Sequence, residues 1–256
     1  MKTGLFLILF ILGSSLLAPL FTPKDALDFN LPNRLQSPST HHYLGTDENG
    51  SDVLAKILYG GRLSLVVALS VVGISSLVGL ILGTWAGYSG GIIDTLLMRF
   101  VDMLQAFPGF LLALALIAFM GSSLTNVIVA LCITGWTAYA RLIKAEVQSI
   151  KEREFVTSAR AIGVSPRKII FRHIWPNVIS PLSVQMTFGL AGAVISEAGL
   201  SFLGLGVPPS TPSWGALLSS GRRYLISAPY LSIFPGIALV VLVLGFNLLG
   251  DGIRKR

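Results

Sequence analysis

Few side chains in this sequence could carry out chemistry, because only 12% of its 256 residues are charged. A phosphate-binding loop of the form G-x-x-x-x-G-K-[ST] is absent, and no nucleophile stands in a pattern that would place it beside a base. The segment DENGSD, from Asp47, does not fit a calcium loop, because its glycine is fourth rather than sixth. His41 and His42 lack further metal ligands nearby. We therefore predict no catalytic residue, no metal site and no cofactor.

Glu197 and Pro108 stand out because each lies inside an apolar stretch. Glu197 is the only acidic residue of its stretch, and charged side chains within a membrane are usually functional or paired. It could face a translocation path, or it could pair with Arg222 or Arg223. Pro108 should kink its helix, and the kink could serve gating or only packing.

A basic segment, residues 144–176, separates two of the most apolar parts of the chain. Phe155, Ala159 and Ile162 recur at helical spacing, and Gly163 suits the residue after a helix end. Pro166 follows a capping serine and fits the first position of a second helix, which should run from 167 to about 174. The sequence predicts a compact elbow of two helices. Its exposed apolar and basic side chains would suit a docking surface for a protein, or an interfacial helix whose arginines meet lipid phosphates.

The composition predicts an all-α polytopic membrane protein, because 53% of the residues are hydrophobic and the mean hydropathy is +0.75. Six transmembrane helices are predicted, at about 5–21, 63–88, 92–120, 124–142, 178–203 and 230–249. Within the second, small residues recur every four positions from Ser75 to Gly87, which lets another helix approach closely. At the inner end of the third, Arg99 and Asp102 are expected to pair on one helix face.

Most of the 19 Lys and Arg residues fall on one side of these spans, which predicts that both termini are cytoplasmic. This distribution accounts for the net charge of +7, and nucleic-acid binding is not expected. We divide the chain into a first transmembrane helix (1–22), an external segment (23–62) and a transmembrane domain (63–256). The external segment should contain an amphipathic surface helix that Ser51 caps and Gly60 and Gly61 end. A cleavable signal peptide is the alternative for the first helix.

Residues 157–176 resemble the signature loop of the integral membrane subunits of binding-protein-dependent ABC importers. Ala159, Gly163 and Pro176 match the pattern at its spacing, whereas Thr157, Ser158, His173 and Trp175 depart from it. Longer stretches resemble the second permease of the dipeptide, oligopeptide and nickel branch: HHYLGTDENGSDVLAKILYGGRLSL, GTWAGYSGGIIDTLLMRFVDMLQAFPG, SEAGLSFLGLGVPPSTPSWG and FPGIALVVLVLGFNLLGDGIR.

The resemblance implies a type I ABC importer permease of the bacterial inner membrane that does not itself hydrolyse ATP. It implies a second permease, two ATPase subunits and an external substrate-binding protein as partners. The loop would dock into the ATPase through eight residues, namely Thr157, Ser158, Ala159, Arg160, Gly163, Pro166, Arg167 and Phe171. Short peptides are the expected substrate and nickel is the alternative. An ion-coupled secondary transporter and a membrane scaffold are the rival functions, although the paired broken helices of the former are not evident.

Overall fold

The computed structural model describes residues 1–22, 29–208 and 211–255, and in these ranges its regular structure is helical apart from one isolated bridge between Thr46 and Asp52. The all-α prediction is confirmed. Residues 23–28 of the predicted external segment lie outside the described residues. The helices are α1 (Lys2–Leu16), α2 (Ala18–Phe21), α3 (Val53–Ser89), α4 (Gly91–Gln105), α5 (Gly109–Met120), α6 (Leu124–Lys151), α7 (Glu154–Ala161), α8 (Pro166–Ile169), α9 (Trp175–Phe202), α10 (Trp214–Gly221) and α11 (Tyr230–Arg254).

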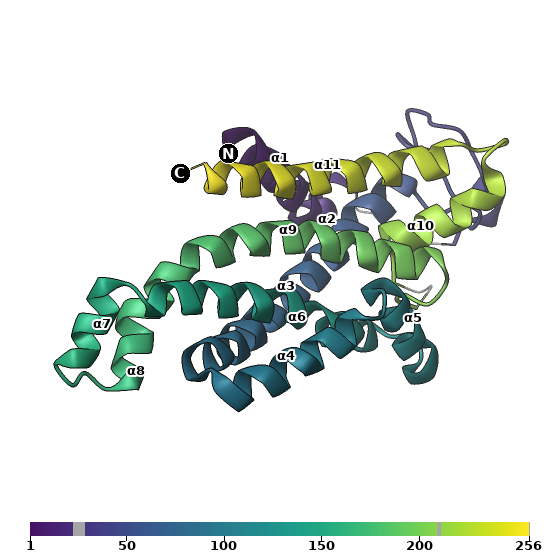
Figure 1. Ribbon diagram of the computed structural model, residues 1–256. Helices are drawn as coiled ribbons and strands as arrows, with labels where there is room; N and C mark the ends of the chain where they lie inside the picture. The colour runs from purple at the N-terminus through teal and green to yellow at the C-terminus, as the bar shows by residue number, and fades with distance from the viewer. Residues whose placement is uncertain (23–28, 209–210, 256) are drawn as a thin grey trace.

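Four continuous helices among the described residues are long and apolar enough to cross a membrane: α3, α6, the run Pro166–Phe202 that contains α8 and α9, and α11. The third predicted span is a bent pair, α4 and α5, whose axes meet at 80°. The first predicted span overlaps α1, an apolar helix of only 15 residues. Both termini lie at the same end of the molecule as α7 and α8, whereas α10 lies at the opposite end (Figure 1).

The helix α3 begins earlier than predicted and runs through the two glycines that were expected to stop it. Asp52, rather than Ser51, caps it, because the Asp52 carboxylate accepts a hydrogen bond from the Ala55 amide at 3.1 Å. The indole of Trp214 packs against Gly60 and Gly61, where a Cβ would come within 3.1 and 3.2 Å of the ring. The prediction of a separate amphipathic helix is therefore wrong, because these glycines make room for a tryptophan and do not end the helix.

The predicted close approach along α3 is confirmed, and its partner is α6 of the same chain. A Cβ at Gly79 would lie 2.9 Å from the Ala140 amide nitrogen, and one at Gly87 would lie 2.8 Å from the Lys144 carbonyl oxygen. Gly83 meets α6 between these two points. No side chain larger than hydrogen fits at these positions, so the two helices pack with their backbones nearly in contact.

The segment around Pro108 is a complete break between α4 and α5. The ion pairs nearby differ from the predicted pair of Arg99 with Asp102. Asp102 instead binds Arg141 at 2.6 Å, and Asp94 binds Lys144 at 2.8 Å. The prediction is wrong because both carboxylates find a cation on α6, against which α4 packs.

Candidate functional site

The basic segment forms the predicted elbow, and its turn depends on Gly163. Gly163 has a φ of +80°, a left-handed conformation that side chains disfavour. Its amide donates to the Arg160 carbonyl at 3.0 Å, and the next amide, of Val164, donates to the Ala159 carbonyl at 3.1 Å. Pro166 then occupies the first turn of α8. The two bonds close the end of α7 and fix the angle at which α8 departs.

The second arm of the elbow is continuous with a membrane-spanning helix. From α8 the chain passes through one π-helical turn, Ile170–Ile174, directly into α9. The expected break before α9 is absent, because Pro176 lies in the first turn of α9, where its missing amide costs nothing. The whole run, Pro166–Phe202, is 37 residues long. A displacement of the elbow tip would therefore be transmitted to α9 without an intervening loop.

The elbow has a small apolar interior of its own. Val156 on α7, Ile169 on α8 and Ile174 in the π turn are fully buried. Ala159, which was predicted to contact a partner, is 8% exposed and also belongs to this interior. Because the two arms pack against each other through these side chains, the elbow is a built unit and not a flexible linker.

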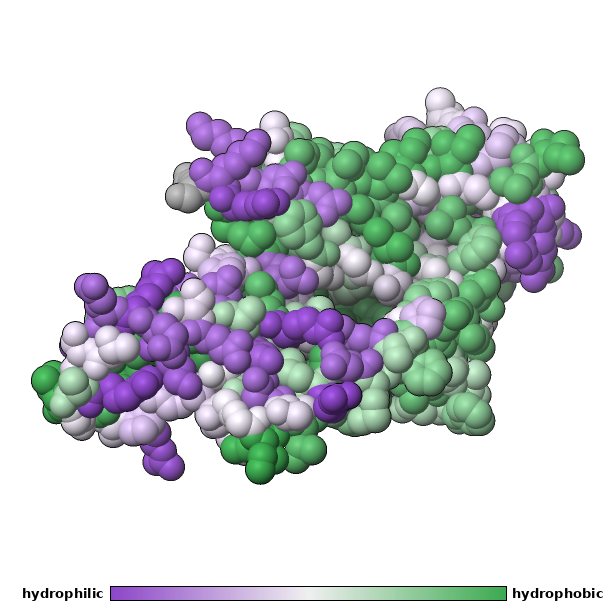
Figure 2. Space-filling model, in the orientation of Figure 1, coloured by the Kyte–Doolittle hydropathy of each residue, from purple (hydrophilic) through white to green (hydrophobic). Residues whose placement is uncertain are grey.

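The other seven predicted docking residues, Thr157, Ser158, Arg160, Gly163, Pro166, Arg167 and Phe171, are exposed. Apolar side chains accompany them on this surface, with Ile162 82% and Phe171 61% exposed. Hydrophilic side chains gather over this end of the molecule, whereas hydrophobic residues cover the middle of α11 (Figure 2). An apolar patch with a basic rim is the composition expected of a protein-binding surface.

Glu197 lies in the interior of the chain and not on an open surface. Its carboxylate accepts hydrogen bonds from the hydroxyls of Ser201, at 2.7 Å, and Ser64, at 3.4 Å. Ser213 lies beside the same carboxylate and also caps α10, where its Oγ accepts from the Ala216 amide at 3.1 Å. Glu197 thus joins α3, α9 and the start of α10, and its partners are these hydroxyls rather than Arg222 or Arg223. Only Ser201, four residues further along the helix, could have been found from spacing.

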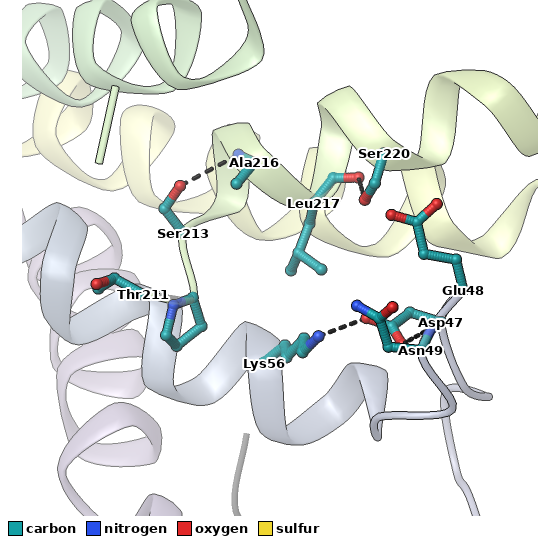
Figure 3. Close-up of a pocket in the computed structure, with 10 residues that line it drawn as sticks. Asp47, Glu48, Asn49, Lys56, Thr211, Ser213, Ala216, Leu217 and Ser220 are labelled. Atoms are coloured by element: carbon teal, nitrogen blue, oxygen red, sulfur yellow. Dashed lines mark hydrogen bonds and ion pairs between the residues drawn. The ribbon is translucent and has the colours of Figure 1, made fainter. Parts of the chain in front are cut away.

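A polar cavity of about 130 Å³ lies beside α10, which is at the end opposite the elbow (Figure 1), and Figure 3 shows residues that line it. Asp47, Lys56 and Ser213 are among the residues that line it. Asp47 binds Lys56 at 2.5 Å and also accepts from the Asn49 and Ser51 amides, at 2.9 and 3.0 Å. The acidic segment is therefore a turn closed by its own carboxylate, and no group of metal-ligating side chains was found in the part of the chain that the structure describes.

Known proteins resemble the chain in sequence along nearly its whole length. Residues 79–256 match the family described as the binding-protein-dependent transport system inner membrane component. The dipeptide transport system permease protein DppC of Alkalihalophilus pseudofirmus is 42% identical over 98% of this chain and 83% of its own length. The glutathione transport system permease protein GsiD of Escherichia coli O157:H7 is 42% identical, over 99% and 84%.

Solved structures support the fold. The MetNI methionine ABC transporter in an inward-facing conformation aligns with a TM-score of 0.63 and 19% identity, over 78% of this chain and 95% of that one. An amino acid ABC transporter solved with histidines aligns with a TM-score of 0.61 and 17% identity, over 78% and 94%. At these identities the likeness shows the fold alone. Together with the matches in sequence, it establishes that the chain belongs to the inner membrane components of binding-protein-dependent transport systems and is the permease of an ABC importer.

Proposed function

We propose that this permease carries short peptides across the inner membrane, and that separate ATPase subunits drive it by gripping the elbow formed by α7 and α8. The observation that carries the proposal is the continuity of Pro166–Phe202, which connects the exposed tip of the elbow to the middle of the spanning bundle. A rigid helix transmits a push along its length, whereas a flexible loop would absorb it.

The elbow would serve as the ATPase contact at the cytoplasmic face, where the distribution of Lys and Arg also places both termini. Ile162 and Phe171 would supply apolar contacts, and Arg160 and Arg167 would supply charge at the rim. Two ATPase subunits, a second permease and an external binding protein would complete the transporter. Closing of the ATPases would then shift the bundle between two states with different access.

Short peptides are the proposed substrate, because the curated relatives are named for dipeptides, for glutathione and, in Brucella suis, for peptides. Nickel, the earlier alternative, gains no support from the side chains, since no group of three or more His, Cys, Asp or Glu gathers among the described residues. The external binding protein would make the first selection among peptides.

The test uses the complete transporter, purified with its ATPases and reconstituted with its binding protein in vesicles. Ile162→Asp places a charge on the exposed tip of the elbow. Ile226→Asp makes the same change in the link between α10 and α11, where Ile226 is 101% exposed. We expect Ile162→Asp to weaken ATPase association about tenfold or more and to reduce ATP-driven dipeptide uptake in proportion. The control variant should retain its ATPase.

Equal ATPase association of the two variants would show that the elbow tip is not the docking surface. A wild-type transporter that retains its ATPase but takes up no dipeptide would instead refute the substrate and leave the docking assignment standing. Arg160→Glu provides a second probe of the rim. Its effect on association should shrink as salt is added, because exposed charges are screened.

A further inference from the structure

A cavity of about 190 Å³ opens between α3, α6 and α9 in the spanning part of the bundle. These three helices pack side by side (Figure 1). Small residues of α6 and α9, among them Gly135, Gly189 and Gly192, give the cavity its width. The wall also contains five polar side chains, those of Ser75, Thr134, Tyr139, Gln185 and Ser196. The rest of the wall is apolar, so these side chains are isolated polar groups in the spanning bundle, where polar groups are usually functional.

Two hydroxyls in this cavity are buried without a satisfactory partner. Tyr139 is 4% exposed and Ser75 is 1% exposed, and neither hydroxyl oxygen makes a hydrogen bond of normal geometry with the described residues. The Cys132 thiol lies beside Ser75, but a thiol is only a weak donor. The Tyr139 hydroxyl lies against Gly189, where any Cβ would collide with it. Both residues line the cavity, so a ligand there is the nearest source of the bonds that the two hydroxyls lack.

The chemistry of the wall favours a neutral ligand with both donors and acceptors. Hydroxyls and a carboxamide can each donate and accept, which matches the N–H and C=O of a peptide group. A transition metal such as nickel would need imidazole, thiolate or carboxylate ligands, and none of the residues that line the cavity provides one. The volume is several times the ~30 Å³ that one water molecule occupies in the liquid, so a group larger than water fits.

The cavity also has a polar continuation toward the end of the molecule that carries the elbow. Gln185 belongs both to its wall and to that of a second, larger cavity of about 610 Å³. Glu146 of α6 and Arg254 of α11 line the second cavity. Their opposite charges complement the ammonium and carboxylate ends of a zwitterionic peptide. Gln185 thus joins a wall without charged residues to one that carries charges of both signs.

We infer that the cavity between α3, α6 and α9 is a site on the translocation path, where the hydroxyls of Tyr139 and Ser75 bind the backbone amide groups of the transported peptide. This inference rests on the proposed function, since it takes a peptide as the ligand. At this site, hydroxyl groups take the place of water around the amide groups of the peptide while the peptide crosses the apolar part of the membrane.

Filling the cavity provides the first test. A Cβ at Gly192 would meet no atom within 4 Å and Gly192 lines the cavity, so Gly192→Leu adds a side chain there without a clash at its Cβ. Gly73→Leu is the matched control, because Gly73 lies on α3, also meets nothing within 4 Å and does not line the cavity. In the reconstituted transporter we expect Gly192→Leu to reduce dipeptide uptake about tenfold or more while assembly with the ATPases is retained. Gly73→Leu should transport normally.

Removing the hydroxyls provides the second test. Tyr139→Phe and Ser75→Ala should each raise the KM for dipeptide uptake about two- to tenfold, because each removes one hydrogen bond to the substrate. Tyr88→Phe and Ser76→Ala are the controls, since neither residue lines the cavity and the Ser76 hydroxyl already bonds to the Gly73 carbonyl at 3.1 Å. Uptake by these controls should match the wild type.

Uptake by vesicles that contain the wild-type transporter separates the hypothesis of a peptide substrate from the hypothesis that the cavity lies on the path. If they take up no dipeptide, the proposed substrate is wrong. If they take up dipeptide and Gly192→Leu does so equally well, the cavity is not on the path and this inference is wrong. Loss of subunit assembly in Gly192→Leu would also overturn it, because the face would then be covered by a partner subunit. Unchanged KM values in both hydroxyl variants would overturn the assignment of Tyr139 and Ser75.

Discussion

The two ends of the molecule differ in how far their functional side chains are engaged within the chain. At the end that carries α10, the partners are internal: the Trp214 indole donates to the Ile57 carbonyl at 2.8 Å, and the Tyr230 hydroxyl lies 2.9 and 3.0 Å from the Gln36 and Thr46 carbonyls. At the elbow end, Ile162 and Phe171 protrude from the surface. The polar groups named at the α10 end are bonded within the chain, whereas the exposed apolar side chains of the elbow form the proposed ATPase contact.

This difference indicates where stability and coupling reside. Substitutions at the α10 end should lower the free energy of unfolding and leave ATPase association intact once the protein is folded. Substitutions at the elbow tip should weaken ATPase association and leave the free energy of unfolding nearly unchanged. Each variant below is therefore measured twice in the assembled transporter, once by thermal unfolding and once by ATPase retention.

The largest effect on stability is expected from Trp214→Ala. Trp214 is 1% exposed and fills the space that Gly60 and Gly61 leave on α3, so its removal creates a cavity and breaks a hydrogen bond. We expect a loss of about 3–5 kcal/mol, seen as a lower Tm. Trp85→Ala is the control, because Trp85 is 54% exposed and should cost far less. Equal Tm values for the two variants would contradict the view that internal contacts of Trp214 stabilise the α10 end.

The largest effect at the elbow is expected from Gly163→Pro. Proline fixes φ near −65°, whereas Gly163 has a φ of +80° and donates its amide to Arg160. The distortion, about 3 kcal/mol or more, would fall on the elbow, so ATPase retention should collapse while the Tm of the spanning bundle changes little. A normal ATPase content in purified Gly163→Pro would mean that the angle of the elbow is unimportant for docking.

An intermediate effect is expected from Glu197→Leu, which removes the acceptor shared by Ser64 and Ser201. Stability should fall by about 1–3 kcal/mol, because buried hydroxyls lose their partner. Glu197→Gln keeps a carbonyl acceptor and should lose less. Peptide uptake should persist in the Gln variant, since the carboxylate is buried among structural partners. Abolished uptake in a fully folded Gln variant would instead assign Glu197 a direct role in transport.

The smallest effect is expected from Asp102→Asn, which breaks the ion pair with Arg141. Both side chains are at least half exposed, so the loss should be about 0–1 kcal/mol. Asp94→Asn is the informative comparison, because Asp94 and Lys144 are more buried and their pair should contribute more. A larger loss for Asp102→Asn than for Asp94→Asn would show that the exposed pair is the one that holds α4 against α6.

Local sequence signals predicted the elbow well. A glycine after a helix and a proline at the next helix start have the same meaning in most proteins, so Gly163 and Pro166 predicted the turn without knowledge of the surroundings. The predictions that failed depended on residues far away in the chain. Gly60 and Gly61 resemble a helix stop until Trp214 is placed beside them. Asp102 pairs with a residue 39 positions away rather than with its neighbour.

The candidate path was similarly out of reach of the sequence. Tyr139 and Ser75 resemble ordinary residues of apolar helices, and only the packing of α3, α6 and α9 shows that their hydroxyls lack partners. Glu197, the more conspicuous residue, has hydrogen-bond partners in Ser64 and Ser201. An isolated charged residue was easy to notice in the sequence, whereas the hydroxyl groups that lack partners could be found only in the structure.

The glycines at positions 79, 83 and 87 have a mechanical consequence. At these positions α3 and α6 pack so closely that even a methyl group is excluded. We therefore expect the two helices to move together as one rigid pair. Sliding or twisting along this seam would force backbone atoms through each other, so transport must leave it undisturbed. Bending would then fall on the links that adjoin these two helices, among them Gly90 after α3 and positions 152–153 after α6.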